Sequence, residues 1–578
     1  MYKINDQVDS TLKNNLPPEA DYSASAGLTW NDQKIANFNV SVRNKIILKT
    51  DNRDEEFFQL DILNEKNSVI TSANIKLSDT EINNINWFSL HNSCVLNPDC
   101  PKAKSYLAAI IKHQLNKTDL APVYCQQINK VGWNKITITD DVIYGYYTGE
   151  KIILPQNIDA DLTERIKLDK SEYVLKSDTN KYSEKAATAG IIKALSLNLR
   201  AGLVIFAFII ASLLKSIFRE CGIPPKFVLY VCGPKDFLKT AYISALSPIC
   251  DKYDYFSKLI IQFTSSSYSI TNLTNDYPDF PVVLDNVYES EDPHIKKKIT
   301  GIFENAVQII GDDIDKNNAR GSYKPASSII VTGEFDGIGN PSTIARYLTN
   351  PVGDDLRNAE KQMVLHKFQI DEPLLIPTFY CYFLQWVVTN IEDIKSGIKD
   401  LLTDFREIGD SFNISPKLRE RYLVLFISFM LFIKYCVSKK YLTNRETIQL
   451  KKDFSDQLLR ICHNHNQTIQ EKEETKNKNA CPDDFFRLIK YWHNNDEFDM
   501  AEDEEDENLE YREALIYDGH LCLRTKPLIA KINKSFPNIK LKTVIAQLVA
   551  KKVLKSDSSR NTAKIKGLRF LKIPLDKF

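Results

Sequence analysis

The segment from Val228 to Thr240, VLYVCGPKDFLKT, constrains the fold of this chain more than any other part of the sequence. A short apolar run leads into Gly233, and Lys239 and Thr240 follow at the spacing of a phosphate-binding loop, G-x-x-x-x-G-K-[ST]. Such a loop joins a buried strand to the N-terminus of a helix, whose free N–H groups attract anions. The spacing therefore predicts a strand–loop–helix unit of an α/β core, with Lys239 on a nucleotide's phosphates and Thr240 on Mg²⁺.

The same loop departs from the pattern in its middle and at its last glycine. Leu238 stands where the pattern has glycine, and the bulky or charged Lys235, Asp236 and Phe237 precede it. Glycine serves such a loop because it reaches positive φ and lets backbone amides approach the phosphate. The sequence therefore leaves open whether this is a working nucleotide-driven motor.

A second segment supplies the carboxylate that a phosphate-binding loop needs. Residues 280–289, FPVVLDNVYE, contain an apolar run that ends at Asp285, about 46 residues beyond the loop lysine. An aspartate at this place holds Mg²⁺ through its water shell. Motors of this class usually have a glutamate next to polarise the attacking water, but this chain has Asn286, which cannot accept the proton. Glu289 and Glu291 are displaced by several residues, and the alternative interpretation is an ordinary buried strand ending in aspartate.

A third apolar run, residues 327–334 (SSIIVTGE), is predicted to be another strand of this core. Its Thr332 is a candidate sensor of the γ-phosphate. The polar, turn-rich stretch before it indicates either a hairpin that carries Arg320 and Lys324 to DNA in the pore of a ring, or a surface loop. Arg346, on a short helix further along, is either an arginine finger for a neighbouring subunit's site or a surface arginine.

Composition indicates a large, folded and electrically balanced chain. Its 578 residues carry 75 Lys and Arg against 75 Asp and Glu, and 43% of them are apolar. The eleven cysteines form no paired framework, which favours reduced thiols, and the N-terminus lacks a secretory signal. The longest apolar runs, 203–214 and 423–433, are too short to cross a bilayer. We therefore expect a cytoplasmic protein with no membrane partner.

Changes in periodicity and charge divide the chain into five segments. Alternating polar and apolar residues predict a β-rich domain before the core, and long periodic stretches predict helices after it. Eleven acidic side chains against one arginine in residues 495–513 predict a solvated linker. The expected segments are an N-terminal β-rich collar domain at 1–128, the α/β core at 129–371, an all-helical lid at 372–494, the acidic linker at 495–514 and a basic domain at 515–578.

The last 64 residues reverse the charge, with fifteen Lys and Arg against three Asp. Two expected helices, 525–535 and 540–552, and a basic strand-forming tail give the element order of a winged helix. In that fold the second helix enters the major groove and the wing contacts phosphate. The alternative is a basic protein-docking domain tethered by its acidic linker. The residues expected to contact DNA are Lys540, Lys542, Lys551, Lys552, Arg560 and Lys564.

One group of cysteine and histidine residues has the composition of a zinc site. Cys462, His463, His465 and Cys481 nevertheless fit no standard ligand spacing. We therefore interpret this stretch as a solvated helix end.

Several short motifs recur in the order found in one family of ATPases. They are GW at 132–133, the apolar helix before the phosphate loop, LDN at 284–286 where the family has LDE, the segment 311–320, TGE at 332–334 and AR at 345–346. Over about residues 130–450 the chain resembles AAA+ ATPases, in particular the Cch-type, MCM-like replicative helicases of staphylococcal cassette elements. The resemblance implies a hexameric ring ATPase with an N-terminal collar, a helical lid and a C-terminal winged helix. It also implies that Arg419, in SPKLRERY, is a lid arginine for the γ-phosphate.

The sequence is thus expected to encode an AAA+ P-loop ATPase of a mobile genetic element or phage-like replicon. It would act on DNA as a helicase or replication initiator, with a replication or accessory protein as partner. The alternative is a non-hydrolysing AAA+-like scaffold, or a regulatory or defence protein, that recruits DNA or a partner. The residues expected to bind ATP and Mg²⁺ are Gly233, Lys239, Thr240, Asp285 and Thr332, with Thr240 and Asp285 on the metal, and those expected in catalysis are Asn286, Arg346 and Arg419.

Overall fold

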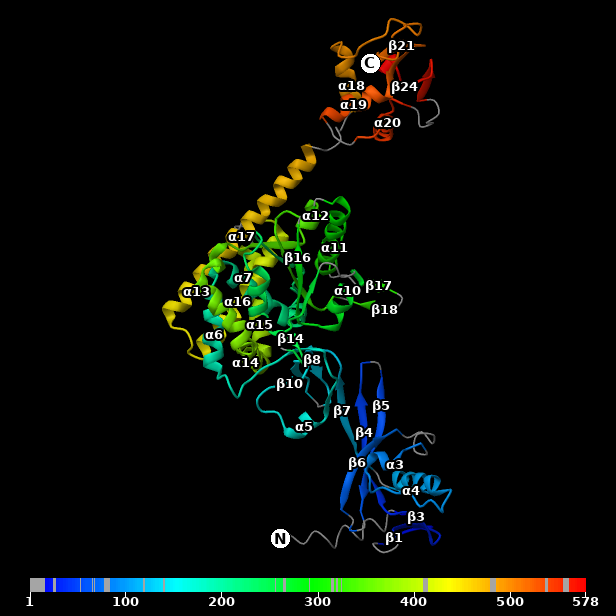
Figure 1. Cartoon of the computed structure of the whole chain (residues 1–578), viewed down its shortest axis with the longest axis vertical. Helices are drawn as coiled ribbons and strands as arrows, with labels where there is room; N and C mark the ends of the chain where they lie inside the picture. The colour runs from blue at the N-terminus through cyan, green and yellow to red at the C-terminus, as the bar shows by residue number, and fades with distance from the viewer. Residues whose placement is uncertain are drawn as a thin grey trace. The chain divides into compact units, whose positions relative to one another are not determined.

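The computed structural model of the chain divides into two compact units, Met1–Asn466 and Gln467–Phe578. Figure 1 shows the helices and strands of both units, coloured along the chain. The residues that the structure describes are 16–23, 27–51, 53–64, 66, 68–76, 84–117, 120–138, 141–254, 256–262, 267–288, 290, 292–312, 316–318, 321–323, 325–408, 414–478, 485–535, 539–554 and 561–577.

The first unit begins with a β-rich region, as the alternating sequence pattern predicts. Across its main sheet the strands are β11 (Ile166–Leu168), β7 (Pro122–Ile128), β4 (Asn39–Lys49), β5 (Asp54–Leu63) and β6 (Val69–Ile75). β4 and β5 form a long antiparallel hairpin, whereas β7 and β11 join it in parallel from later in the chain. Helix α4 (Ala103–Lys117) packs against β4, and the core between them includes Leu107 and Ile111. The same core holds β1 (Ala20–Ser23), β2 (Gly27–Trp30), β3 (Gln33–Ala36) and the one-turn helix α3 (Trp87–Leu90).

A buried aspartate ties the next small sheet to the centre of the unit. This antiparallel sheet consists of β8 (Gly132–Ile136), β9 (Ile143–Tyr147) and β10 (Ile152–Ile153). Asp279 accepts hydrogen bonds from the main-chain nitrogen of Trp133 (3.2 Å) and from the nitrogen and hydroxyl of Ser216 (2.7 and 2.8 Å). At Gly132 φ is 89°, and a Cβ would lie 2.6 Å from the Asp279 carboxylate. Gly132 and Trp133 therefore hold this sheet against Asp279. Burial raises the pKa of Asp279 to about 6.

The centre of the first unit is a five-stranded parallel sheet, which confirms the predicted α/β class. Across it the strands are β15 (Ile260–Gln262), β16 (Pro281–Val287), β19 (Ser328–Gly333), β13 (Val228–Cys232) and β20 (Tyr347–Pro351). Because every pair is parallel, the strands end together at one end of the sheet, the carboxyl end, and begin together at the amino end. The three strands with the predicted nucleotide motifs, β13, β19 and β16, are neighbours.

Helices cover both faces of this sheet. α7 (Leu199–Leu213) packs on β16 and β20, and α11 (Pro293–Asp312) packs on β13 and β19 from the other side (Figure 1). All residues of α7 from Ala201 to Leu213 are buried, as its all-round apolar sequence predicts. A short pair, β12 (Tyr173–Leu175) and β14 (Ile249–Asp251), lies outside the sheet. Further helices are α5 (Ala160–Glu164), α6 (Glu184–Ser196), α8 (Lys215–Glu220), α9 (Lys239–Leu246), α10 (Ser267–Asp276), α12 (Pro341–Ile344), η1 (Asp354–Arg357) and α13 (Ala359–His366).

Beyond the sheet the chain is helical, as predicted for the lid. After a π-helical turn, η2 (Lys367–Asp371), the helices are α14 (Leu375–Thr389), α15 (Ile391–Ile408), α16 (Pro416–Ser438) and α17 (Asn444–Lys478). Among the described residues, α16 is the one helix long and apolar enough to cross a membrane, and 72% of its apolar window is buried inside the protein. It packs against α7, where the rings of Phe206 and Phe432 meet edge to face 4.9 Å apart. Packing in the core thus accounts for the apolar composition of α16.

The second unit packs helices on one face of an antiparallel sheet. The strands lie in the order β21 (Ala514–Tyr517), β22 (His520–Arg524), β24 (Leu568–Pro574) and β23 (Thr562–Ile565), and the helices are α18 (Phe485–Asn494), α19 (Thr525–Ser535) and α20 (Leu541–Ala550). The predicted succession of helix, basic helix and hairpin is present as α19, α20 and β23–β24. α18, which we assigned to the lid, instead shares a core with α19 and α20 through Ile489, Ile532 and Leu548.

The acidic segment, predicted to be a solvated linker, is folded onto this second unit. Phe498 and Leu509 are buried within it. Arg512 forms ion pairs with Asp499 (2.8 Å) and Asp506 (3.2 Å), which draw the segment together. The linker prediction is therefore wrong, because a few apolar side chains, Arg512 and basic residues from later in the chain (Arg524, Lys531 and Lys566) hold this mostly charged stretch in place.

Candidate functional site

The loop between β13 and α9 takes a backbone conformation that its sequence resists. Asp236 and Leu238 have φ of 65° and 55°, in the left-handed region that favours glycine. At Gly233 the loop passes so close to Val352 that a Cβ would lie 2.7 Å from the carbonyl oxygen of that residue. The loop therefore turns into α9 without its second glycine, and two strained residues make the turn.

Lys239 is the first residue of α9, and its side chain folds back over the loop. The ammonium donates hydrogen bonds to the carbonyl oxygens of Gly233 (2.7 Å) and Pro234 (2.8 Å). Burial lowers the pKa of Lys239, and the negative charge of Glu334, just after β19, opposes that shift. The loop thus holds a positive charge beside the N-terminus of α9, where exposed N–H groups also favour an anion.

A cluster of oxygen atoms surrounds Asp285 near the end of β16. Its Oδ1 accepts hydrogen bonds from the hydroxyls of Thr240 and Thr332, each at 2.5 Å. Gln262, the last residue of β15, donates to Oδ2 at 3.3 Å. The carboxyl ends of β15, β16 and β19 and the first turn of α9 therefore bring these four side chains to one place.

This cluster fits the chemistry of Mg²⁺, which prefers oxygen ligands and retains several of its waters. Asp285 supplies a carboxylate and Thr240 a hydroxyl, and these two would hold the ion through their oxygens. Thr332 is buried and bonded to the same carboxylate oxygen, so it fixes the orientation of Asp285. When bound, Mg²⁺ would supply positive charge that offsets the negative charge of a nucleotide's phosphates.

Asn286 is exposed at the carboxyl end of the sheet, with φ of 77°. Its main-chain nitrogen donates to the Thr332 hydroxyl at 2.9 Å, which ties its backbone to the cluster around Asp285. Glu289 and Glu291 lie outside the described residues. Besides Asp285 and Asp236, Glu334 is a carboxylate close enough to the loop for its charge to act on Lys239.

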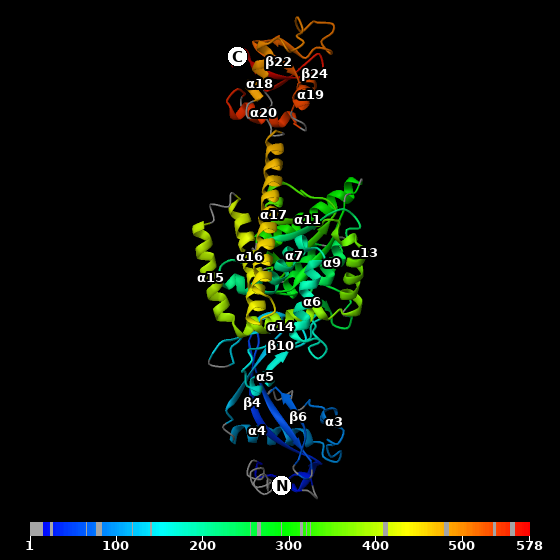
Figure 2. The ribbon, with the colours of Figure 1, turned by 90° about the vertical axis from the view of Figure 1, so that its left-hand side faces the viewer.

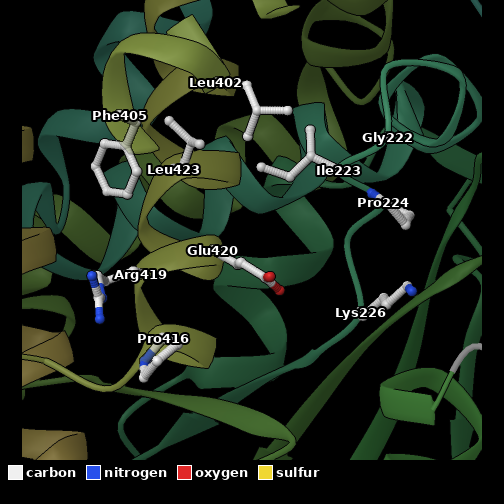
Figure 3. A pocket seen from close by; sticks show the side chains of 10 residues that line it. All are labelled: Gly222, Ile223, Pro224, Lys226, Leu402, Phe405, Pro416, Arg419, Glu420 and Leu423. Carbon is white, nitrogen blue, oxygen red and sulfur yellow. The ribbon is translucent and has the colours of Figure 1, made fainter. Parts of the chain in front are cut away.

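The two predicted catalytic arginines lie at the amino end of the sheet, opposite the phosphate loop of their own chain. Arg346 directly precedes β20, and its Nε pairs with the Asp312 carboxylate at 2.7 Å. Arg419, on α16, lines a cavity of about 300 Å³ together with Lys226 and neighbouring residues that precede β13 (Figure 3). Because β13 spans five residues, about 16 Å of extended chain, it separates this cavity from Lys239.

The predicted hairpin before β19 is present as a pair of short antiparallel strands. These are β17 (Lys316–Asn318) and β18 (Gly321–Tyr323). Arg320 and Lys324, the residues expected to contact DNA there, lie outside the described residues. Their contact with DNA stays a prediction.

The basic residues expected to contact DNA in the second unit come from α20, the turn after it and the hairpin. Arg560 lies outside the described residues. Across the hairpin Lys564 pairs in register with the exposed Arg569, which we did not predict and which the alternation of strand residues would have indicated. The exposed, described members of the predicted set are Lys540, Lys542, Lys551, Lys552 and Lys564.

The stretch interpreted as a solvated helix end is part of the core instead. Cys462 and His465 are buried, while His463 is exposed and Cys481 lies outside the described residues. His465 is within hydrogen-bond distance of the hydroxyl of Thr349 and of the main-chain carbonyl of Ile344. Within the described part of the chain, no group of three or more His, Cys, Asp or Glu side chains is arranged to hold a metal.

Sequence reasoning missed two groups at the carboxyl end of the sheet. Gln262 contacts Asp285, and Glu334 acts on Lys239 through its charge. Both stand at or just beyond the end of a strand of the same parallel sheet. That position is the signal that could have found them, because parallel strands deliver their final side chains to a common crevice.

The fold defines a mixed α/β protein with a helicase-like architecture. Among solved structures, the chain is similar to one titled "SCCmec type IV Cch - active helicase", with a TM-score of 0.50 and 13% identity over 97% of this chain and 98% of that chain. "The X-ray structure of JCV Helicase" matches with a TM-score of 0.21 and 13% identity over 43% of this chain and 75% of that chain, which is too low a similarity to support an argument. No protein-family model and no curated protein matches the chain.

Proposed function

We propose that this chain is an AAA+ ATPase that forms a ring and acts on DNA, as a helicase or a replication initiator. The observation that carries the proposal is the cluster of Thr240, Asp285 and Thr332 beside Lys239, at the carboxyl ends of adjacent parallel strands. Lysine, hydroxyl and aspartate are the groups that bind the phosphates and Mg²⁺ of a nucleotide. The shared fold of a protein titled an active helicase, from a cassette element, supports assigning the chain to a mobile element or phage-like replicon.

The placement of the arginines supports assembly into a ring. Arg346 and Arg419 lie at the opposite end of the sheet from the phosphate loop of their own chain. An arginine there can act only on the nucleotide of a neighbouring copy, so each site is completed by two subunits. A closed ring of six, as in the family that the sequence resembles, gives every copy such a neighbour.

The basic face of the second unit supports a role on DNA. Lys540 and Lys542 at the start of α20, and Lys551 and Lys552 just after it, are exposed around one helix. Each lysine that neutralises a phosphate releases counterions, so affinity falls with added salt. Replacing Lys551 and Lys552 with alanine should lower the salt slope by about 2, since each phosphate contact contributes about 1.

The test of the DNA role uses the full chain and a short duplex, titrated by fluorescence anisotropy over a range of salt concentrations. A matched control replaces Lys451 and Lys452 of α17 with alanine and should leave the slope unchanged. Equal slopes for all three proteins would remove the second unit from DNA binding and favour a protein-docking role.

The test of the motor is ATP hydrolysis with and without DNA, by the wild type and by Lys239→Ala. We expect hydrolysis that DNA stimulates and that the substitution abolishes. Hydrolysis that survives Lys239→Ala would refute the assignment of the site.

A specific observation favours a second candidate function, a scaffold that binds ATP without hydrolysing it. Asn286 occupies the place of the expected glutamate, and an amide cannot take a proton from the attacking water. Asn286→Glu distinguishes the two candidates, with Asn286→Ala as a control that meets the same unfavourable positive φ but adds no carboxylate. A scaffold that lacks only its base should gain hydrolysis with glutamate and not with alanine. A wild type that already hydrolyses ATP would exclude the scaffold and make Glu334 the first residue to examine as a base.

A further inference from the structure

The short segment that carries Arg346 is held by its backbone. The four carbonyl oxygens of residues 344–347 each accept a hydrogen bond from elsewhere in the chain. In order along the segment, the donors are His465 (3.0 Å), Arg421, the main-chain nitrogen of Val228 (3.2 Å) and Arg421 again (2.7 Å). We call this set of bonds the carbonyl clamp. Because all four carbonyl oxygens are hydrogen-bonded, no peptide group of residues 344–347 can turn without breaking a hydrogen bond.

Both side chains of the clamp are buried, Arg421 to 4% exposure and His465 to 2%. The guanidinium of Arg421 lies 5.7 Å from the ring of Phe227, and the imidazole of His465 meets the ring of Tyr347 edge to face at 5.3 Å. A buried carbonyl without a donor is unfavourable, so the segment can leave this position only by breaking several bonds together. The clamp therefore fixes the position of the Arg346 backbone.

The protonation of His465 follows from its partners. Nε2 faces the carbonyl oxygen of Ile344, which can only accept, so Nε2 carries the proton. Nδ1 lies 3.2 Å from the hydroxyl oxygen of Thr349, which donates its own proton to the Asp336 carboxylate at 2.8 Å. Burial and the charge of Arg421 lower the pKa of His465 to about 3, so the imidazole stays neutral at physiological pH. The clamp is thus a permanent structure rather than a pH switch.

The side chain of Arg346 is aimed by a second, separate set of contacts. Its Nη1 donates to the carbonyl and hydroxyl oxygens of Ser342 (2.8 and 2.5 Å), and its Nε pairs with Asp312. Gly311 leaves room for it, because a Cβ there would lie 2.9 Å from the Arg346 side chain. The Arg346 side chain remains 23% exposed. The backbone is thus set by the lid helices and β13, and the side chain by α11 and α12.

The clamp residues come from the two long helices of the lid. Arg421 lies on α16 and His465 on α17, and Figure 2 shows these helices side by side. They are in contact, with the rings of Phe429 and Phe454 stacked 4.2 Å apart. α17 continues to Lys478, beyond the end of the first unit at Asn466. A movement of either helix would therefore move the segment that carries Arg346.

We propose that Arg421 and His465 are positioning residues for Arg346, through which α16 and α17 set how that arginine meets the nucleotide of a neighbouring copy. The proposal rests on the proposed function, since it assumes that Arg346 acts on a second subunit. Neither residue touches the nucleotide. Both act through the backbone at residues 344–347. A displacement of about 1 Å at a catalytic group is enough to lower a rate about 100-fold.

The test uses mixed rings of the full-length chain. His465→Ala has an intact phosphate loop but a displaced Arg346. Lys239→Ala has a well-placed Arg346 but a phosphate loop that no longer binds ATP. Each variant alone should hydrolyse ATP about 100-fold more slowly than the wild type or worse. Mixed in equal amounts, they form interfaces with one good loop and one good arginine, so hydrolysis should rise well above either alone.

Two control variants and a second measurement make this test specific. His463→Ala changes the same residue type two positions away, where the side chain is exposed, and should match the wild type. His465→Gln keeps an amide donor for Ile344 and should recover most of the activity. Hydrogen exchange at residues 344–349 should be faster in His465→Ala than in both of these proteins.

Recovery in mixed rings together with faster exchange would support the positioning role. Absence of recovery, although His465→Ala is folded by circular dichroism, would overturn it, because the defect would then lie in the site of its own chain. If the wild type hydrolyses no ATP, the proposed hydrolytic function fails separately. Hydrogen exchange alone then tests whether His465 holds this segment. Unchanged exchange at residues 344–349 in His465→Ala would overturn the proposal.

Discussion

The two ends of the core sheet solve the problem of holding a functional side chain in opposite ways. At the carboxyl end, Asp236, Leu238 and Asn286 all have positive φ and are partly or fully exposed, the first two in the phosphate loop and Asn286 near the end of β16. At the amino end, the carbonyl clamp binds every carbonyl of residues 344–347, with Arg421 as a buried donor to two of them. The phosphate loop is thus strained in its backbone although side chains around it hydrogen-bond one another, whereas the backbone of residues 344–347 is held by hydrogen bonds.

This difference follows from what each end is proposed to do. A loop that binds phosphate must keep its N–H groups available for the ligand, so it cannot satisfy them within the chain. Left-handed residues other than glycine cost about 1 kcal/mol each, and surrounding packing must impose them. An arginine that acts on the nucleotide of a neighbouring copy needs a fixed backbone position. Buried hydrogen bonds provide that fixed position. Stability should therefore depend on the amino end and ligand affinity on the carboxyl end.

The largest expected effect is the loss of Arg421. Arg421→Met keeps the length of the side chain but leaves the carbonyls of Ala345 and Tyr347 without their donor. Because each unsatisfied buried group costs about 1–3 kcal/mol, we expect the free energy of unfolding to fall by about 3 kcal/mol. The measurement is urea unfolding followed by tryptophan fluorescence.

The matched control at the carboxyl end is Lys235→Met in the phosphate loop, where the side chain is exposed. It should change the free energy of unfolding by no more than about 0.5 kcal/mol, as is usual for surface positions. If Arg421→Met were equally mild, the contrast between the two ends would disappear, and the clamp would be a consequence of the fold rather than a support for it.

The next effect concerns ligand affinity at the carboxyl end. Lys239→Ala removes the ammonium beside the phosphate loop, and a hydrogen bond to a charged group contributes about 1.5–3 kcal/mol. We expect ATP binding, measured by calorimetry, to weaken by about 10- to 100-fold. The free energy of unfolding should not fall much, because burial already disfavours the charged form of Lys239. Lys235→Ala is the control, and a similar loss of affinity in it would indicate a general charge effect.

The third prediction uses pH to isolate the clamp. The pKa of His465 is lowered to about 3 in the folded chain, against about 6.5 in an unfolded one. Between these values the unfolded state binds a proton that the folded state does not, so stability is complete above pH 6.5 and falls as the pH is lowered. At pH 5 this residue alone should cost about 2 kcal/mol relative to pH 7.

Comparison with a variant cancels the contribution of the other titrating groups to the pH dependence of stability. Asp279, with a pKa raised to about 6, works in the opposite direction, since its folded form gains a proton first and stability rises as the pH falls through that value. The difference between the wild type and His465→Gln cancels that contribution, whereas His463→Gln should keep the wild-type profile. Identical profiles for wild type and His465→Gln would show that His465 does not remain neutral in the fold.

The sequence was informative where function depends on local spacing. The strand before Gly233, the strand that ends near Asp285 and the position of Thr332 follow from short motifs, and their residues do meet in the structure. The parallel sheet follows from the same alternation of apolar strands with helices. These features are predictable because each motif lies within one strand and its following loop.

The amino end was not predictable because its contacts join distant parts of the chain. His465 is 121 residues from Ile344, and Arg421 is 74 residues from Tyr347. Nothing in the local sequence distinguishes a buried histidine that holds a carbonyl from an exposed one, and the expected solvated helix end was therefore wrong. The acidic segment was mispredicted for a related reason, since charge counts conceal a few buried residues such as Phe498.

The smallest expected effect tests the strain at the carboxyl end directly. Leu238→Gly places glycine at a residue with φ of 55°. Relief of about 1 kcal/mol of strain is offset by the greater freedom of glycine in the unfolded chain, so the free energy of unfolding should change by less than about 1 kcal/mol. Without a Cβ, the backbone amides can approach the phosphate more closely. One additional hydrogen bond of about 1 kcal/mol would tighten ATP binding about fivefold.

Leu238→Ala separates backbone conformation from side-chain bulk. Alanine removes most of the half-buried side chain but keeps the Cβ, and therefore keeps the strain at this residue. Calorimetry on the three proteins should give tighter ATP binding for glycine alone. If alanine bound ATP as tightly as glycine, bulk rather than backbone strain would limit the site, and the distinction between a strained end and a bonded end would lose its functional meaning. If neither differed from leucine, the loop would already hold its amides at the distance a phosphate requires, because packing around it compensates fully for the missing glycine.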